Sequence, residues 1–309
     1  MEVYEEYVPI GKTLQYFLHC PVPETDTVLL YLHGGPGFSA AYRAYLLDTP
    51  HPPCTLVFYD QRGTGKTLLQ NKSDRPTVST LLKDLHSIIS YLKEKYQTEK
   101  LLLLGHSWGS VLGTQYVLQH PDTVSAYIGM GQVVNMLRGE KAAFAELKRR
   151  IFVQGRPGDM RRCKRLERRL SFQSPKSFQK SRRGLSLLQY RYGFYPKIYT
   201  AVKNVWKSPV FSIKDVFSFL MAPRTNKALD RSLWEFDAAS TCEYALPVYY
   251  ILGEEDWQVP SALAAQLFEK IRAPQKQLFW IPKAGHSTDI DNPAAFWCAL
   301  EKILWQICS

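Results

Sequence analysis

Long apolar runs are missing from this 309-residue chain, and so are clustered cysteines. No stretch approaches the roughly 20 consecutive apolar residues that a membrane-spanning helix needs, so we expect no membrane span. The six cysteines are scattered, and none forms a C-x-x-C pair or a Cys/His cluster. A disulfide framework and a zinc site are therefore not expected. The first residues, MEVYEEYVPIGK, are acidic where a signal peptide would be basic, and we predict a cytoplasmic protein.

Acidic residues are scarce in one region of the chain. Residues 138–215 carry 21 Lys and Arg against five Asp and Glu, a net charge of +16, whereas the whole chain has a net charge of +11. Such asymmetry can indicate a nucleic-acid or membrane partner, but it also fits a solvated helical face or attraction of an anionic substrate. Because no nucleic-acid-binding motif accompanies the charge, we predict no nucleic-acid partner.

Short apolar segments alternate with helical patterns in the first part of the chain. Segments of this length that are apolar throughout suit strands buried on both faces of a parallel sheet. Between two of them, Leu81, Leu85, Ile88 and Leu92 recur at helical spacing. This rhythm predicts a mostly parallel, doubly wound α/β sheet. The predicted strands are 13–20, 27–34, 55–60, 101–106, 124–131, 246–253 and 277–282.

The rhythm breaks over residues 134–240, which are basic, rich in aromatic residues and helical in pattern. It resumes with the strand at 246–253 and a helix that contains Leu263 and Leu267. Asn292 and Pro293 are suited to begin a closing helix, as its N-cap and first helical residue. We therefore predict an α/β core made of residues 1–133 and 241–309, interrupted by a helical cap insertion at 134–240.

The segment Gly105-His106-Ser107-Trp108-Gly109 matches G-x-S-x-G and lies between a predicted strand and a helical pattern. This context gives the motif its meaning, because the glycines allow a sharp turn that exposes the serine hydroxyl at the end of the sheet. The N-terminus of the following helix points at developing negative charge. Ser107 is therefore the candidate nucleophile.

A glycine-rich segment, HGGPG at residues 33–37, ends the predicted strand 27–34. Glycine lets backbone N–H groups approach a substrate carbonyl, and acyl transfer needs two such donors for the tetrahedral oxyanion. We expect the N–H groups of Gly35 and Trp108 to be these donors. A plain tight turn is the alternative for this segment.

His286 follows the last predicted strand, where the chain order Ser…Asp…His places the general base. A surface histidine is the alternative. Asp256, in GEEDWQVP after the strand 246–253, would accept the histidine Nδ1–H and fix its tautomer. Glu255 is adjacent to it, and Asp289 and Asp291 follow the histidine, so these three are rivals for the carboxylate role.

Two further motifs receive structural interpretations. The segment DQRGTGKT at residues 60–67 contains GTGKT, but a phosphate-binding G-x-x-x-x-G-K-[ST] loop needs glycine where Asp60 stands. We therefore expect a structural turn beside the oxyanion loop. His33 and His106 are expected to support loops.

Together these residues resemble the proline iminopeptidase group of α/β-hydrolases, a family of serine aminopeptidases. HGGPG, DQRGTGKT and GHSWGS match motifs of that group, and GEEDWQVP and AGHS resemble its aspartate and histidine loops. The resemblance covers residues 27–132 and 246–307 but not the insertion. It implies an α/β-hydrolase fold and removal of an N-terminal residue, often proline, from short peptides.

The cap of that family supplies acidic groups that hold the free α-amino group of the substrate. Glu140 and Glu235 are the candidates here, although neither matches the family's cap motifs, and ordinary surface carboxylates are the alternative. The basic cap of this chain leaves proline specificity open. Five cap aromatics are expected either to line an apolar pocket or to pack within the cap: Tyr190, Tyr192, Phe194, Tyr195 and Trp206.

The predicted mechanism is acyl transfer from a peptide or other small molecule to Ser107, with no metal or organic cofactor. Three other functions fit the same residues. One is an esterase, lactonase or amidase, and another is a carbon–carbon bond hydrolase acting on diketone-like substrates. The third is a non-catalytic small-molecule receptor, in which Ser107 would not react with active-site serine probes. The oligomeric state is not predicted.

Overall fold

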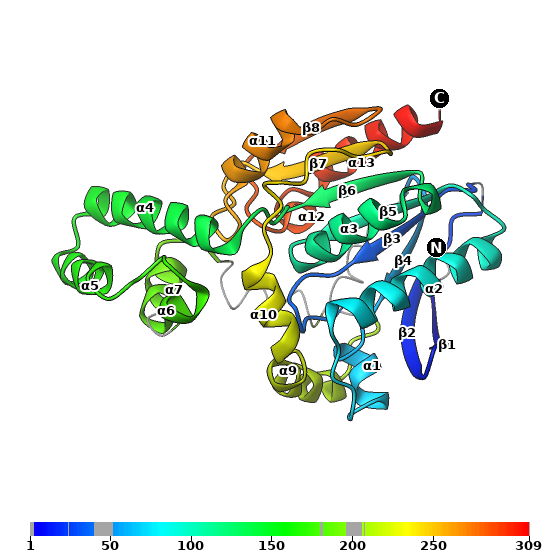
Figure 1. Ribbon diagram of the computed structural model, residues 1–309, viewed down its shortest axis with the longest axis horizontal. Coiled ribbons are helices and arrows are strands. Elements are labelled where there is room, and N and C mark those ends of the chain that lie inside the picture. The colour runs from blue at the N-terminus through cyan, green and yellow to red at the C-terminus, as the bar shows by residue number, and fades with distance from the viewer. Residues whose placement is uncertain are drawn as a thin grey trace.

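One eight-stranded sheet with helices on both faces forms the centre of the computed structural model (Figure 1). The structure describes residues 3–23, 25–39, 52–179, 182–195, 206 and 208–308. The strands are β1 (Tyr4–Ile10), β2 (Thr13–Cys20), β3 (Val28–Leu32), β4 (Thr55–Tyr59), β5 (Leu101–His106), β6 (Ala126–Met130), β7 (Val248–Gly253) and β8 (Lys276–Ile281).

Twelve α-helices accompany the sheet in the part of the chain that the structure describes. They are α1 (Gly65–Gln70), α2 (Val78–Tyr96), α3 (Trp108–Gln119), α4 (Met136–Gln154), α5 (Pro157–Glu167), α6 (Pro175–Gln179), α7 (Arg182–Arg191), α9 (Ile213–Thr225), α10 (Lys227–Glu235), α11 (Ser261–Lys270), α12 (Thr288–Asp291) and α13 (Pro293–Cys308).

The strand order is β1-β2-β4-β3-β5-β6-β7-β8, and all neighbours from β4 to β8 pair in parallel. The seven predicted strands are all present, and the predicted mostly parallel sheet is confirmed. Strand β1 was not predicted from the sequence. It is an antiparallel edge strand, half of it exposed, and YEEYVPI has no continuous apolar run to reveal it.

The central strands are buried on both faces, as their uninterrupted apolar sequences predict. In β5, Leu101 and Leu103 belong to one core cluster, whereas Leu102 and Leu104 belong to the other. Helices α2, α3 and α11 pack in the first cluster, and α13 packs in the second. The closing helix begins at the predicted residue, since the Asn292 side chain accepts a hydrogen bond of 3.3 Å from the N–H of Ala295.

Helices α4 to α10 lie in sequence between β6 and β7, which are neighbours in the sheet. The two ends of this segment are joined, because Asn135 pairs with Asp237 and the N–H of Ala238 donates to Val134 at 2.8 Å. Helices α4 to α7 extend away from the sheet, and α9 lies below it beside α1 (Figure 1). The boundaries 134–240 remain a prediction.

A third core cluster holds α4 to α7 together, and Tyr192 and Phe194 are buried in it. Packing within the cap is therefore the role these two aromatics have, whereas Trp206 is 63% exposed. Cys20, Cys54 and Cys163 are buried and carry free thiols. No helix in the described ranges has the length and apolar content needed to cross a bilayer.

Candidate active site

Four loops that carry predicted site residues follow β3, β5, β7 and β8. These strands run in parallel, so their carboxyl ends lie along one edge of the sheet. Ligands of open α/β sheets bind at this edge. Gly35, Ser107, Asp256 and His286 come from these loops, although Ser107 and His286 are far apart in sequence.

The turn between β5 and α3 holds Ser107 in a sterically costly conformation. Ser107 has φ 55° and ψ −119°, which a residue with a side chain adopts only when its surroundings enforce it. Close packing at Gly109 holds the turn in this conformation, because a Cβ on Gly109 would lie 2.1 Å from the backbone oxygen of Leu32 in β3. The helix must therefore begin pressed against the sheet, and the serine is left at the tip of the turn, partly exposed.

His286 and Asp256 meet across the same edge. The Nδ1–H of His286 donates to Asp256 Oδ2 at 2.8 Å, and the Asp256 side chain is fully buried. The other carboxylate oxygen accepts hydrogen bonds from the N–H groups of Gln258 and Val259, at 3.0 and 2.9 Å. A buried carboxylate held in this way fixes the imidazole so that its Nε2 faces away from Asp256.

Two neighbours hold the imidazole of His286 in place. The ring of His106, the residue before Ser107, lies 4.9 Å from it, and His106 Nε2 donates to the His286 backbone oxygen at 3.1 Å. Gly131, just after β6, also packs against the His286 ring, since a Cβ on this glycine would lie 2.9 Å from His286 Cε1. His106 thus supports the histidine loop, as predicted.

The rival carboxylates have other positions. Glu255 is exposed. Asp289 is buried and accepts a hydrogen bond of 3.3 Å from the hydroxyl of Tyr31. Asp291 accepts one of 2.9 Å from the N–H of Gly285, which shapes the histidine loop. The structure brings Asp256 to His286, and it gives these three side chains other surroundings.

The loop after β3 packs directly on the serine turn. A Cβ on Gly34 would lie 3.2 Å from Ser107 Cβ, so the N–H of Gly35 follows one residue later beside the serine. Gly35 has φ 130°, a conformation open to glycine. Trp108 is the first residue of α3, where backbone N–H groups have no acceptor within the helix.

Gln61 connects these two loops and was not singled out from the sequence. Its side-chain oxygen accepts from the Trp108 indole at 3.0 Å, and its amide donates to the His33 backbone oxygen at 3.2 Å. The His33 ring in turn accepts from the Gln61 N–H at 3.0 Å. Its place in the DQRG motif was the sequence signal that could have identified Gln61. Gly131, which contacts His286, was also not singled out, and its position at the end of a parallel strand was the corresponding signal.

The rest of the DQRGTGKT turn closes around the Asp60 carboxylate. The Ser39 hydroxyl donates to one of its oxygens at 2.9 Å, and the N–H of Lys66 donates to the other at 2.6 Å. A Cβ on Gly65 would lie 2.0 Å from that second oxygen. The turn is therefore organised around its own carboxylate, which agrees with the structural role predicted for it.

Glu140, on α4, is 4% exposed. It accepts a hydrogen bond of 3.1 Å from Gln189, and Arg182 lies 3.8 Å away. Burial raises its pKa above the ordinary value, against the opposing effects of Arg182 and Gln189. Burial also raises the pKa of Tyr195 to about 12, with contributions from the charges of Glu140 and Asp256. Helix α4 lies against the segment after β7 at this point, since a Cβ on Gly139, the residue before Glu140, would lie 3.4 Å from Pro260.

Glu235 is not brought to this region. Helix α10 buries Leu233 and Trp234, and this register turns Glu235 to solvent. Its side chain is 57% exposed and lies 2.8 Å from Arg231 on the same helix. Among the residues that the structure describes, no group of three or more His, Cys, Asp or Glu side chains is arranged to hold a metal ion.

A family model described as alpha/beta hydrolase fold matches residues 27–293, and the chain therefore belongs to the α/β hydrolase fold family. The chain is 26% identical over 301 residues to the Bacillus subtilis protein named "Probable aminopeptidase YbaC", covering 93% of this chain and 92% of that protein. It is 31% identical to a proline iminopeptidase of Saccharolobus solfataricus over 128 residues, which are 41% of this chain and 40% of that one.

Among solved structures, the chain is similar to a proline iminopeptidase-related protein from Thermus thermophilus. The TM-score is 0.62 at 24% identity, and the match covers 99% of both chains. The predicted fold and the predicted resemblance to the proline iminopeptidase group are both confirmed.

Proposed function

We propose that the protein is a serine hydrolase that acts through an acyl-enzyme, with Ser107 as nucleophile, His286 as general base and Asp256 as its orienting carboxylate. The observation that carries this proposal is the 2.8 Å contact between His286 Nδ1 and buried Asp256 at the sheet edge where the Ser107 turn ends. One relative named as a probable aminopeptidase and another named as a proline iminopeptidase support a hydrolase.

In this mechanism His286 Nε2 removes the Ser107 hydroxyl proton as the oxygen attacks a substrate carbonyl. Asp256 stabilises the imidazolium that forms. The N–H groups of Gly35 and Trp108 stabilise the oxyanion, because donors that are fixed beforehand need no reorganisation during the reaction. His286 then gives its proton to the leaving group, and water repeats the sequence to release the acyl group.

The substrate we propose is a short peptide that loses its N-terminal residue. Glu140 is the carboxylate that we propose holds the substrate α-ammonium group, because it is buried and its ion-pair partner among the described residues, Arg182, stands 3.8 Å away. An ammonium group within hydrogen-bond distance of Glu140 would compensate its buried charge more fully than Arg182 does at 3.8 Å. The cytoplasmic location stays a prediction.

Kinetics on matched substrates test the proposal. Aminoacyl-naphthylamides with a free α-amino group should be cleaved, and N-acetylation should lower kcat/KM by about 30-fold or more because it removes the charge that pairs with Glu140. Glu140→Gln should reduce the ratio of kcat/KM between free and acetylated substrates. Glu235→Gln changes an exposed carboxylate and is the matched control, which should leave that ratio unchanged. Equal rates on free and acetylated substrates would contradict aminopeptidase action, and faster turnover of simple acyl esters would favour an esterase.

A further inference from the structure

Helix α9 has four of its large apolar side chains on the outside, whereas Phe219 and Met221 are half-buried. Asp215, Ser218, Ala222 and Thr225 are the residues that it buries. The opposite face carries four exposed apolar residues at helical spacing: Ile213, Val216, Phe217 and Leu220, which are 69%, 42%, 61% and 72% exposed. An amphipathic helix of a water-soluble protein normally has the reverse arrangement.

The orientation of α9 is set by specific contacts of its inner face. Asp215 accepts a hydrogen bond of 2.7 Å from the N–H of Ser212 and lies 3.6 Å from the ammonium group of Lys66 on α1. At the other end, the Asn226 side chain donates to the backbone oxygen of Gly63 at 2.7 Å. The helix is therefore held at both ends with its polar face inward, and rotation to bury the apolar stripe would break these contacts.

The apolar stripe is bordered by positive charge. Lys214 and Arg224 on α9 are exposed, and so is Lys227 at the start of α10. The only other charged residue of α9, Asp215, is buried. On α5 and at its C-cap, a second basic face is formed by residues exposed at helical spacing: Arg161, Lys164, Arg165 and Arg168.

We propose that the outer face of α9 binds the surface of an anionic lipid bilayer. An apolar stripe flanked by cations is what interfacial helices use, because apolar side chains enter the headgroup boundary while cations attract anionic lipids. A second copy of the chain is a poorer partner, since each copy carries a net charge of +11. Trp206, 63% exposed, packs 5.9 Å from Phe211 just before α9 and is an aromatic residue of the kind found at membrane interfaces.

Flotation with vesicles tests this surface directly. Wild-type protein should float with vesicles of phosphatidylcholine and phosphatidylglycerol in equal parts, float poorly with phosphatidylcholine alone, and be released by added salt. Phe217→Ser/Leu220→Ser should lower partitioning at least about tenfold, because two apolar side chains no longer leave water. Lys214→Gln/Arg224→Gln should also weaken it, by about 30-fold, at roughly fivefold for each cation.

The matched control is Trp305→Ser, on α13. Trp305 is 73% exposed, and Figure 1 shows α13 at the top beside β7 and β8, whereas α9 lies at the bottom beside α1. It should float like wild type, and all variants should keep their turnover of a small soluble substrate and their thermal unfolding. Absence of flotation with anionic vesicles, or equal flotation of the Phe217→Ser/Leu220→Ser variant, would overturn the proposal. So would a concentration-dependent dimer, seen by light scattering, that this variant abolishes.

Discussion

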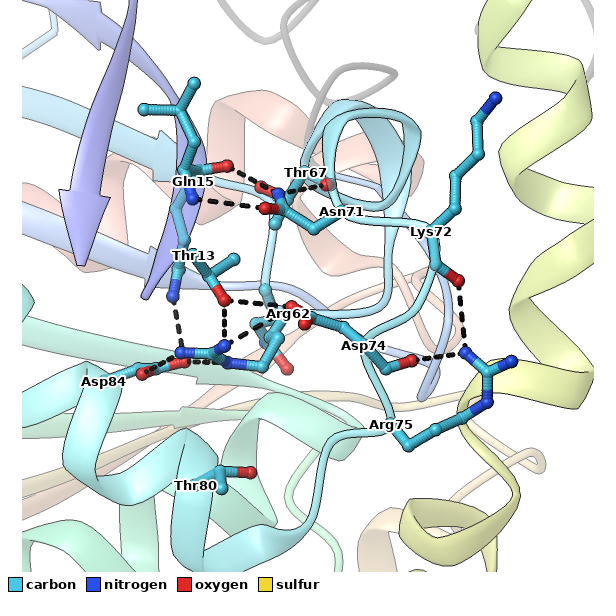
Figure 2. A network of polar contacts seen from close by, with 12 residues as sticks. Thr13, Gln15, Arg62, Thr67, Asn71, Lys72, Asp74, Arg75, Thr80 and Asp84 are labelled. Carbon is cyan, nitrogen blue, oxygen red and sulfur yellow. Dashed lines mark hydrogen bonds and ion pairs between the residues drawn. The ribbon is translucent and has the colours of Figure 1, made fainter. Parts of the chain in front are cut away.

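Arg62 is the centre of a polar network whose loss should destabilise the fold (Figure 2). Its Nε and Nη2 groups donate to the two carboxylate oxygens of Asp84 on α2, at 2.8 and 2.7 Å. Its Nη1 group lies 3.3 Å from Asp74 Oδ2 and also donates to Thr13. Gln15 donates to Asp84 at 2.8 Å. The network ties β2, α2 and the turn after β4 together.

Arg62→Met keeps most of the side-chain length and removes the charge. Arg62 and Asp84 are 15% and 10% exposed, so the carboxylate would be left nearly buried without its cation. Removing one partner of a fully buried pair costs about 3–5 kcal/mol, and partial contact with water lowers our expectation to about 2–4 kcal/mol of unfolding free energy. The hydrogen bonds to Asp84 also raise the pKa of Arg62, which is consistent with a strong pair.

Urea unfolding followed by tryptophan fluorescence measures this loss. Arg75→Met is the matched control, because Arg75 is exposed and donates to the backbone oxygens of Lys72 and Asp74. It should change the unfolding free energy by less than about 0.5 kcal/mol. The double variant Arg62→Met/Asp84→Leu should lose less unfolding free energy than its two single variants lose together. Equal losses for both arginines, or a loss below about 1 kcal/mol for Arg62→Met, would refute the reasoning.

Four further outcomes are expected. Ser107→Ala should lower kcat by about 10⁴-fold or more with unchanged unfolding, and a tenth of the activity remaining would exclude this nucleophile. Asp256→Asn should cost about 10⁴-fold, because an amide favours the wrong histidine tautomer, whereas Asp289→Asn should cost far less in the same assay. Because burial raises the pKa of Glu140, the preference for free-amine over acetylated substrates should fall as the pH drops through a midpoint above 4.5, and Glu140→Gln should remove this trend. Burial lowers the pKa of His19 from 6.5 to about 4, so the unfolded chain binds more protons in that interval. This histidine should then cost about 3 kcal/mol of unfolding free energy, measured in urea, as the pH drops from 6.5 to 4. His19→Gln should remove that share of the fall and leave the share due to carboxylates of lowered pKa, such as Glu6.

The sheet was predictable because its strands are buried on both faces. The four leucines of β5 leave no polar position at which this part of the strand could face water, so the sequence alone indicates a central strand. Edge strand β1 could not be found in this way, because its burial comes from pairing with β2 rather than from a run of apolar residues.

The candidate site was predictable where a residue type and its position along a strand coincide. Ser107, Asp256 and His286 each follow a strand, and parallel strands bring such positions to one edge. The exposed position of Glu235 could not be predicted from the sequence, because it depends on which face of α10 is buried. The outward apolar face of α9 was also hidden, since helical periodicity identifies an apolar stripe without saying which side it faces.

The junction of β6 and β7 has a consequence for how this chain can vary. Val134 and Asn135 pair with Ala238 and Asp237, so the segment leaves the sheet and returns to it at one point. A change in the length of α4 to α7, which extend away from the sheet, would leave the register of Tyr127 with Val248 at this junction in place. Helix α9 is more constrained, because Asn226 at its end donates to the backbone oxygen of Gly63.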